Sequence, residues 1–436
     1  MPRWLRIVLI VLAVLILLDI VVGIPLSRAY LRHLDWYKER IADPPVRRAV
    51  VGERVTSPEE RKVTHEGRRE TIGEGKDAIT VLYLKGSFYE MGYQRGVLMR
   101  NEVRESVRRA MSAYYAVVRE EIYGLYVFDR LTAHWLLDDA YTVMTPYIPD
   151  EYKQEMEGLA DGSGVPLKTI QRIHAIPCLG ETSCSGIAAM GDATEDGRLY
   201  QVRVLDYFME YGIQDYAVIA VYQPDEGNAF ADVTWAPFVG VVSGMNEKGV
   251  ALSEMSYGGP GQDRAGIPEP QPEERIDGIP MHFLLKDILR LADDVEQATD
   301  LMRDARRTNY YIHIVGDGIT SDGVPQARGY ISTSERCDAY VPGDPTYPIP
   351  PIEDVIYASR YNDRCRELLE VYYGRLNPRV FMDVIIPAIA MDINLCNVVY
   401  DPAGLRMWVA NAEGAKGRAC NGGYVEFNLG EALARR

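Results

Sequence analysis

The residue with the clearest chemical potential is Cys184, which stands where the chain changes from helical to strand-like periodicity. A thiol nucleophile needs a base that removes its proton and donors that stabilise a developing oxyanion. If Cys184 is the first residue of its own chain, its α-amine can act as that base, because a free α-amine titrates at about 7.7–8.0. This mechanism requires a cysteine at the start of a β-strand, released by cleavage just before it. The sequence around Cys184 fits that requirement.

Histidine is the usual alternative base, and the folded region contains His134, His174, His282 and His313. None of them has a surrounding signature. A Cys-His-Asn peptidase that pairs Cys184 with His174 or His313 needs no cleavage and therefore remains an alternative. Cys178 is a rival nucleophile, but no strand–turn–strand pattern in register follows it.

The residues after Cys184 predict a β-hairpin that would position the thiol. SGIAAMG reads as a strand, Glu195-Asp196-Gly197 as the turn, and RLYQVRVLDY as the returning strand. Before Cys184 the apolar spacing is helical, and the expected helices cover residues 92–122, 131–145, 150–160 and 167–175. After the hairpin, the expected strands cover 216–222, 229–234, 239–243, 250–256, 310–315, 328–332, 397–400, 406–410 and 423–427. The later expected helices cover 281–291, 295–305, 362–372 and 379–386. Antiparallel hairpins grouped around paired helices predict an α+β fold of layered sheets and helices.

The N-terminus predicts a membrane helix. Residues 7–24 are apolar except for Asp19, and Arg3 and Arg6 precede them. A run of this length can span a bilayer and exceeds an ordinary signal-peptide core, so we expect residues 1–25 to be an uncleaved signal anchor. A cleaved signal peptide, which would make the protein secreted, is the alternative. The polar residues 26–76 read as a stalk, and residues 77–436 read as the catalytic domain, placed outside the cytoplasm.

Composition narrows the classes of partner and cofactor. The formal charge of −16 argues against a nucleic-acid partner, since such affinity comes mainly from neutralising phosphates. The six cysteines form no C-x-x-C pair, so neither a metal nor another cofactor is implied. The glycine-rich segments GGPGQD and VGDGITSDG lack the Gly-Lys-Ser/Thr ending of a phosphate loop and read as turns.

Five segments in order resemble the N-terminal-nucleophile hydrolases, and most of all the acyl-coenzyme A:6-aminopenicillanic acid acyltransferase family (peptidase family C45). The matching segments lie at residues 86–96, 183–207, 244–251, 397–411 and 424–427. The resemblance implies an αββα sandwich and autocatalytic cleavage of the Ser183–Cys184 bond. The products would be an α part (77–183) and a nucleophile-bearing β part (184–436) that stay together. It also implies amide hydrolysis or acyl transfer through a thioester on Cys184.

The resemblance assigns roles to further residues. Arg203-x-x-Asp206 has a spacing that recurs in the related bile-salt and penicillin V hydrolases. Asp206 would orient the α-amine, and Arg203 would tune the thiolate or bind a carboxylate; a plain cross-strand ion pair is the alternative. Ser256 stands where bile-salt hydrolases place an oxyanion-hole asparagine, so Ser256, Tyr257 or a backbone N–H would serve there.

The chain departs from the family near its Thr-Asn-His stretch. Arg360 replaces the asparagine, or the asparagine is shifted to Asn362. An arginine in the pocket would favour a carboxylate-bearing substrate. A membrane-anchored binding scaffold with a degenerate site is the non-enzymatic alternative. The substrate, an amide or another small acyl donor, is not named by the sequence.

Overall fold

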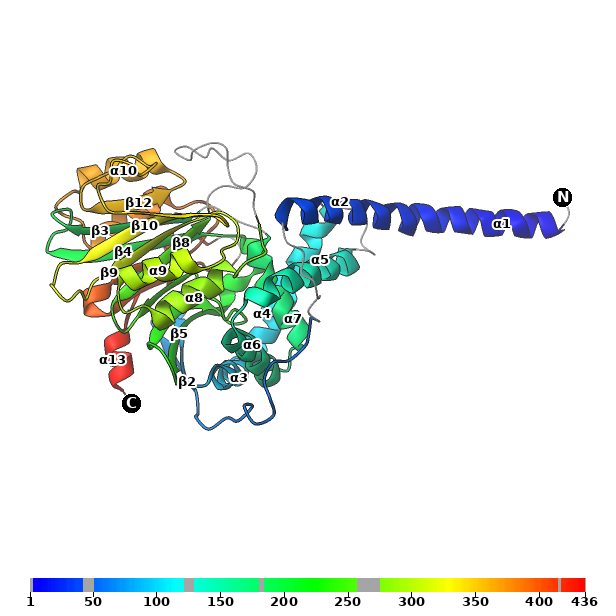
Figure 1. The fold of residues 1–436 in the computed structure, drawn as a ribbon, viewed down its shortest axis with the longest axis horizontal. Coiled ribbons are helices and arrows are strands. Elements are labelled where there is room, and N and C mark those ends of the chain that lie inside the picture. The colour runs from blue at the N-terminus through cyan, green and yellow to red at the C-terminus, as the bar shows by residue number, and fades with distance from the viewer. Residues whose placement is uncertain are drawn as a thin grey trace.

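Two β-sheets lie face to face, with helices on the outer face of each (Figure 1). The computed structural model describes residues 3–41, 51–120, 129–179, 184–256, 275–414 and 417–435. One hydrophobic cluster fills the space between the first sheet and its helices, and a second fills the space between the sheets and beneath the helices of the second sheet. The expected α+β class and its order of layers are therefore confirmed.

The first sheet has nine strands, which pair in chain order except where β5 joins β2. That pair is parallel and the others are antiparallel. The strands are β1 (Arg68–Ile72), β2 (Ile79–Gly86), β5 (Ala217–Pro224), β6 (Phe230–Trp235), β7 (Ser243–Asn246), β8 (Val250–Ser256), β9 (Tyr311–Asp317), β10 (Gln326–Ser332) and β11 (Cys337–Tyr340).

The second sheet has six antiparallel strands, and the predicted hairpin lies at its centre. In spatial order the strands are β12 (Val355–Ser359), β3 (Cys184–Gly191), β4 (Gly197–Asp206), β13 (Asn394–Asp401), β14 (Arg406–Asn411) and β15 (Val425–Asn428). Gln201 connects the two sheets, since its Nε2 donates to Ser253 Oγ at 3.0 Å and to the Ile314 carbonyl at 3.1 Å.

The helices fall into three groups. Those on the first sheet are α3 (Phe88–Leu98), α8 (Met281–Leu291) and α9 (Val295–Asp304), and beside them α4 (Arg100–Val118), α5 (Asp129–Met144), α6 (Asp150–Ser163) and α7 (Leu167–Ala175) pack on one another. Those on the second sheet are α10 (Asn362–Val371), α11 (Pro378–Val380), η8 (Phe381–Ile385) and α12 (Ile386–Ile389), and α13 (Leu429–Ala434) closes the chain. At the N-terminus, α1 (Arg3–Leu18), η1 (Asp19–Gly23) and α2 (Ile24–Arg40) run on as one long helix (Figure 1).

The N-terminal helix is long and apolar enough to cross a membrane, as the sequence predicts, although a signal sequence would meet the same description. The segment expected as a stalk is more structured than its polarity indicated. Residues 24–40 are helical and bury Pro25, Ala29 and His33. Strand β1 is hydrogen-bonded into the first sheet. A polar sequence folds here because its few apolar or aromatic residues meet a partner surface.

Two sequence predictions of secondary structure were wrong in detail. The helix expected over 92–122 is interrupted at Met99, whose φ of −125° and ψ of 33° leave the helical region and separate α3 from α4. The strand expected at 239–243 forms only from Ser243 onward. The backbone before Ser243 is hydrogen-bonded to helices instead. Val239 N donates to His174 Nε2 of α7, and Val241 N donates to the His282 carbonyl of α8.

The helical layer depends on a close crossing of α3 and α6. Gly92 and Gly96 of α3 face Gly158 and Gly162 of α6, a pair of G-x-x-x-G spacings. A Cβ at any of the four would collide with backbone atoms of the other helix. The absence of side chains lets the two backbones touch and increases their dispersion contact.

We expect Gly158→Ala to destabilise the protein by about 2–3 kcal/mol, because the added methyl group meets the Tyr89 carbonyl and the helices must separate. Urea unfolding followed by circular dichroism measures the change. Gly430→Ala in α13 is the matched control, since a Cβ there has ordinary contacts and alanine favours helix. Equal stability of the two variants would contradict this account of the crossing.

Candidate active site

Cys184 is the first residue of β3, at the point where the chain enters the second sheet. It pairs with Leu205 of β4 and is 5% exposed. Gly186, two residues further, faces the first sheet at a place where a Cβ would collide with the Met255 sulfur. The lack of a side chain there lets the sheets approach closely, so the thiol lies between them rather than on the surface.

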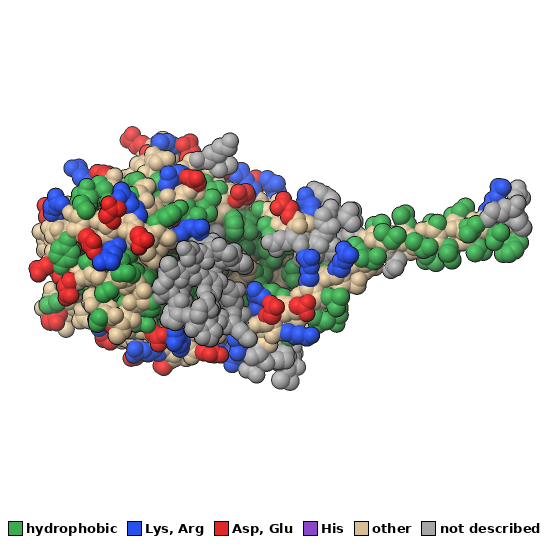
Figure 2. All heavy atoms as spheres, turned by 90° about the horizontal axis from the view of Figure 1, so that it is seen from above, with side chains coloured by type: hydrophobic (Ala, Val, Ile, Leu, Met, Phe, Trp, Pro, Cys, Tyr) green, Lys and Arg blue, Asp and Glu red, His purple; other side chains and the backbone are tan. Residues whose placement is uncertain are grey.

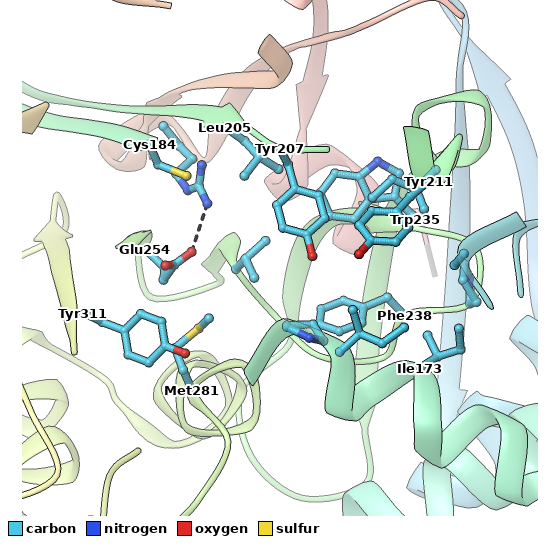
Figure 3. A pocket seen from close by; sticks show the side chains of 17 residues that line it. Ile173, Cys184, Leu205, Tyr207, Tyr211, Trp235, Phe238, Glu254, Met281 and Tyr311 are labelled. Carbon is cyan, nitrogen blue, oxygen red and sulfur yellow. Dashed lines mark hydrogen bonds and ion pairs between the residues drawn. The ribbon is translucent and has the colours of Figure 1, made fainter. Parts of the chain in front are cut away.

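The thiol lines a largely apolar pocket of about 850 Å³, which includes space open to solvent (Figure 3). Cys184, Arg203 and Glu254 form the polar end, while Tyr211 and Phe238 belong to the apolar part. The remaining lining residues are Ala110, Ile173, Ile176, Pro177, Leu205, Tyr207, Ile213, Trp235, Pro237, Val242, Met281 and Tyr311.

Arg203 and Glu254 form a buried ion pair beside the thiol. Arg203 Nη2 donates to Glu254 Oε2 at 3.0 Å, and the side chains are 1% and 6% exposed. Burial raises the pKa of the Glu254 carboxyl, an effect that the Arg203 charge opposes. The pair crosses from the second sheet to the first, and it places a cation where a thiolate would form.

Asp206 ends β4 within a network of amides. Its Oδ1 accepts from Asn394 Nδ2 at 3.0 Å and from Met391 N at 3.2 Å. Asn394 also bonds with Asn397 at 2.9 Å. Burial raises the pKa of Asp206 to about 6, although the bonds from Asn394 and Met391 lower it. The carboxyl is therefore held in one orientation close to the start of β3.

In the uncut chain the thiol of Cys184 is a weak nucleophile. Burial, aided by the charges of Glu254 and Asp206, raises its pKa to about 12. The Arg203 charge and a hydrogen bond from the Asp206 backbone lower it. Since the thiol stays protonated at neutral pH, reaction at this site needs a base close to it.

The histidines do not supply that base in this geometry. Among the described residues, no histidine lines the pocket. His174 Nδ1 donates to the Ile170 carbonyl at 2.8 Å, and its Nε2 accepts from Val239 N at 3.0 Å. Burial lowers the pKa of His174 to about 4 and that of His313 to about 3. His134 lies on α5 and bonds with the Tyr115 hydroxyl at 2.7 Å.

The structure brings Cys184, Arg203 and Asp206 together but leaves Arg360 and Asn362 outside the pocket lining. Arg360 follows β12, is exposed, and does not line the pocket. Asn362 starts α10, and its Oδ1 accepts from Ser359 N at 2.9 Å. Ser183, Tyr257 and the side chain of Ser256 lie outside the described residues, so their predicted roles stay predictions.

Two residues of the site escaped the sequence reasoning, Glu254 and Asn394. Glu254 interrupts the apolar strand VALSEMS, and Asn394 precedes the apolar strand LCNVVY. A charged or amide side chain within an apolar strand indicates a buried polar contact, because such groups need partners when buried. This pattern could have identified both residues from the sequence. All six cysteines are free thiols in this structure.

We expect Arg203→Met to lower the free energy of unfolding by about 3 kcal/mol, because it leaves Glu254 buried without its cation. Adding Glu254→Gln should recover part of the loss, which a double-mutant cycle by urea unfolding would measure. Additive losses from the two substitutions would show that the pair does not interact in solution.

We expect His174 to make the protein less stable as the pH falls. A histidine whose folded pKa is near 4 and whose unfolded pKa is near 6.5 binds its proton preferentially in the unfolded chain. Its stabilisation is complete above about pH 6.5 and decreases below it, by up to about 1.4 kcal/mol per pH unit. His174→Gln should therefore show a smaller loss of stability than the wild type between pH 7 and pH 5. Parallel losses in urea midpoints would contradict this assignment.

The sequence resembles several proteins of modest identity. No family model matches the chain. Protein dcd1B of Dictyostelium discoideum is 27% identical over 259 residues, which are 56% of this chain and 49% of that protein. Protein dcd1A of the same organism is 25% identical over 373 residues, 79% of this chain and 81% of that protein. The chain thus spans about half the length of dcd1B and most of dcd1A.

The solved structures that match parts of the chain at low similarity include three hydrolases or acylases. The N-acylethanolamine-hydrolyzing acid amidase ortholog of Caenorhabditis elegans has a TM-score of 0.37 and 14% identity, over 50% of this chain and 93% of that one. A conjugated bile acid hydrolase of Clostridium perfringens has a TM-score of 0.35 and 11% identity, over 57% and 93%. Penicillin V acylase of Agrobacterium tumefaciens has a TM-score of 0.33 and 11% identity, over 52% and 83%. Because the scores and identities are low, an activity has to be inferred from the residues of the site.

Proposed function

We propose that the protein is a self-processing thiol amidohydrolase or acyltransferase whose nucleophile is Cys184. The observation that carries the proposal is the position of this thiol. It begins a central strand, faces an apolar pocket, and has a buried arginine and a buried aspartate beside it. The acyltransferase-like family indicated by the sequence motifs belongs to the same proposal.

The first step of the proposed chemistry is cleavage of the Ser183–Cys184 bond. The Cys184 sulfur attacks the Ser183 carbonyl carbon, the carbon–nitrogen bond breaks, and the thiol proton passes to the departing nitrogen. Water then hydrolyses the thioester, leaving a carboxylate on Ser183 and a free thiol and α-amine on Cys184. Asp206, with its pKa of about 6, is partly ionised near neutral pH and can hold the new amine in place.

Turnover then uses the amine as the base. The free α-amine, which titrates at about 7.7–8.0, takes the thiol proton while the sulfur adds to the substrate carbonyl. The Arg203 cation favours the thiolate. The amine returns the proton to the leaving nitrogen, and water or an acceptor amine attacks the acyl thioester. An acceptor amine would make the reaction acyl transfer rather than hydrolysis.

The pocket favours a substrate with an apolar group beside its scissile amide. Aromatic and aliphatic side chains supply most of the wall, and the polar groups gather at Cys184. An apolar acyl or amine group would displace water from this wall and hold the amide against the thiol. We also propose that α1 anchors the enzyme in a membrane, with the catalytic domain on the extracytoplasmic side.

Intact mass and N-terminal sequencing of the purified chain test the proposal. We expect two associated fragments, one of which begins at Cys184. Cys184→Ala should stay uncut, because it lacks the attacking sulfur. Cys178→Ala is the matched control and should be processed like the wild type.

An uncut wild-type chain would contradict self-processing. Loss of amide turnover in His174→Gln and His313→Gln, with Cys184 still labelled by an electrophile, would then indicate a histidine-dependent peptidase. An uncut chain whose Cys184 resists labelling would instead indicate a binding scaffold.

A further inference from the structure

The apolar N-terminal helix is fixed to the catalytic domain rather than joined to it by a tether. Helix α2 continues α1 and lies along α5 (Figure 1). His33 of α2 faces Asp139 of α5, with Nε2 3.1 Å from Oδ2, and each side chain is 5% exposed. The His33 ring lies 4.1 Å from that of Trp135, and Tyr30 stacks on the same indole at 6.5 Å. A buried polar pair inside an aromatic contact fixes the angle between the two helices.

The outer surface of this junction is apolar. We call it the interfacial patch, and it consists of Leu26, Tyr30, Leu31, Leu131 and the half-buried Trp135. Leu131 is 65% exposed, Leu31 58% and Tyr30 54%. The Tyr30–Trp135 contact joins the two helices here, with Leu26 and Leu131 one turn before those residues. Exposed large apolar side chains arranged in this way mark an interaction surface.

The position of the interfacial patch along the helix identifies its partner. The apolar run of residues 7–24 is about 27 Å long at 1.5 Å per residue, close to the thickness of a bilayer core. Leu26, Tyr30 and Leu31 follow it within two turns, at the depth where tyrosine and tryptophan anchor membrane proteins. Exposed Arg28, Arg32 and Arg130 lie among these residues and complement anionic headgroups.

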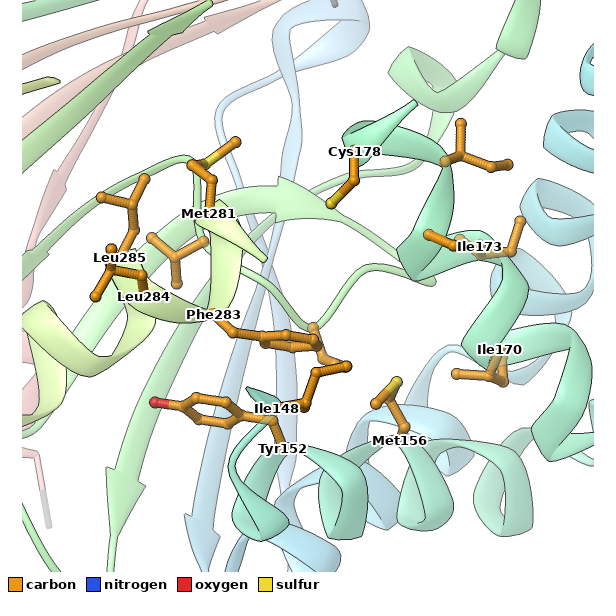
Figure 4. Packing of buried hydrophobic residues seen from close by; sticks show 14 of the residues in the cluster. Ile148, Tyr152, Met156, Ile170, Ile173, Cys178, Met281, Phe283, Leu284 and Leu285 are labelled. Carbon is orange, nitrogen blue, oxygen red and sulfur yellow. The ribbon is translucent and has the colours of Figure 1, made fainter. Parts of the chain in front are cut away.

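The same helical layer forms part of the pocket. Helix α5 packs against α4 and α7, which supply Ala110 and Ile173 to the lining. Apolar side chains also surround a hollow between the body and the base of the N-terminal helix (Figure 2). Buried side chains such as Ile170, Ile173 and Met156 fill the interior of this layer (Figure 4).

We propose that the interfacial patch is a membrane-binding surface that seats the α2–α5 junction in the headgroup region of an anionic bilayer. The domain is thereby held in one orientation, with the helical wall of its pocket beside the membrane. This inference rests on the proposed membrane anchor. The effect of the interfacial patch on catalysis rests on the proposed function.

Quenching by bromine-labelled lipid tests the seating without any assay of activity. The full chain is placed in nanodiscs of phosphatidylcholine and phosphatidylserine, and its tryptophan fluorescence is compared with and without the brominated lipid. Trp135→Phe should lose a quenchable part of the emission. Trp408→Phe is the matched control, since Trp408 lies on β14 in the second sheet, and it should retain that part. Equal quenching in the two variants would overturn the proposal.

Charge substitution on the interfacial patch tests its effect on turnover. Leu131→Asp should lower turnover of a bilayer-embedded amide several-fold and leave that of a water-soluble amide unchanged, because an aspartate resists seating in the interface. Val371→Asp, at an exposed apolar position of α10, is the matched control and should alter neither. Equal turnover of the embedded amide by both variants would overturn the coupling. If the unsubstituted chain turned over no amide, the proposed function would fail while the quenching result still decided the seating.

Discussion

The site depends on one constraint, which is that a thiol and several ionisable groups are buried together between two sheets. Water is a poor competitor there, so each charge has to be stabilised by the protein. Arg203 meets Glu254, and Asp206 meets Asn394 and Met391. These contacts span β4, β8 and β13, so both sheets must assemble before the site exists. The arrangement also explains why the Cys184 thiol stays protonated, since burial is the largest cause of its raised pKa.

The same burial explains why His174 has a structural role and does not act as a base. His174 satisfies both ring nitrogens with backbone groups, and burial keeps it neutral. It therefore supports the irregular segment between β6 and β7, which carries Pro237 and Phe238 into the pocket wall. A histidine that fills this role stabilises the shape of the site without titrating near neutral pH. In the proposed mechanism the base is the α-amine that cleavage would expose on Cys184, a group whose pKa suits the task.

Close packing of glycine on glycine holds together the helical layer that supplies Ala110 and Ile173 to the pocket. The crossing of α3 and α6 brings two helices to backbone contact, and α4, α5 and α7 pack around them. The N-terminal helix then adds to this layer through His33 and Trp135. The chain thus links a membrane-length helix and a pocket wall by continuous packing. Close-packed interiors transmit position because they resist local rearrangement.

The sequence by itself determined the local features: the hairpin after Cys184, most helices and strands, the Arg203–Asp206 spacing and the apolar N-terminal run. Each follows from periodicity or turn chemistry within a short window, where neighbouring residues decide the conformation. Only the tertiary structure decided that Glu254 reaches Arg203, that Asn394 holds Asp206, that Arg360 stays outside the pocket, and that α2 docks on α5. Those contacts join residues more than 50 positions apart in sequence for the Arg203 pair and more than 180 for Asp206. No local sequence pattern predicts contacts between residues so far apart in the chain, because these contacts depend on how the sheets and helices pack.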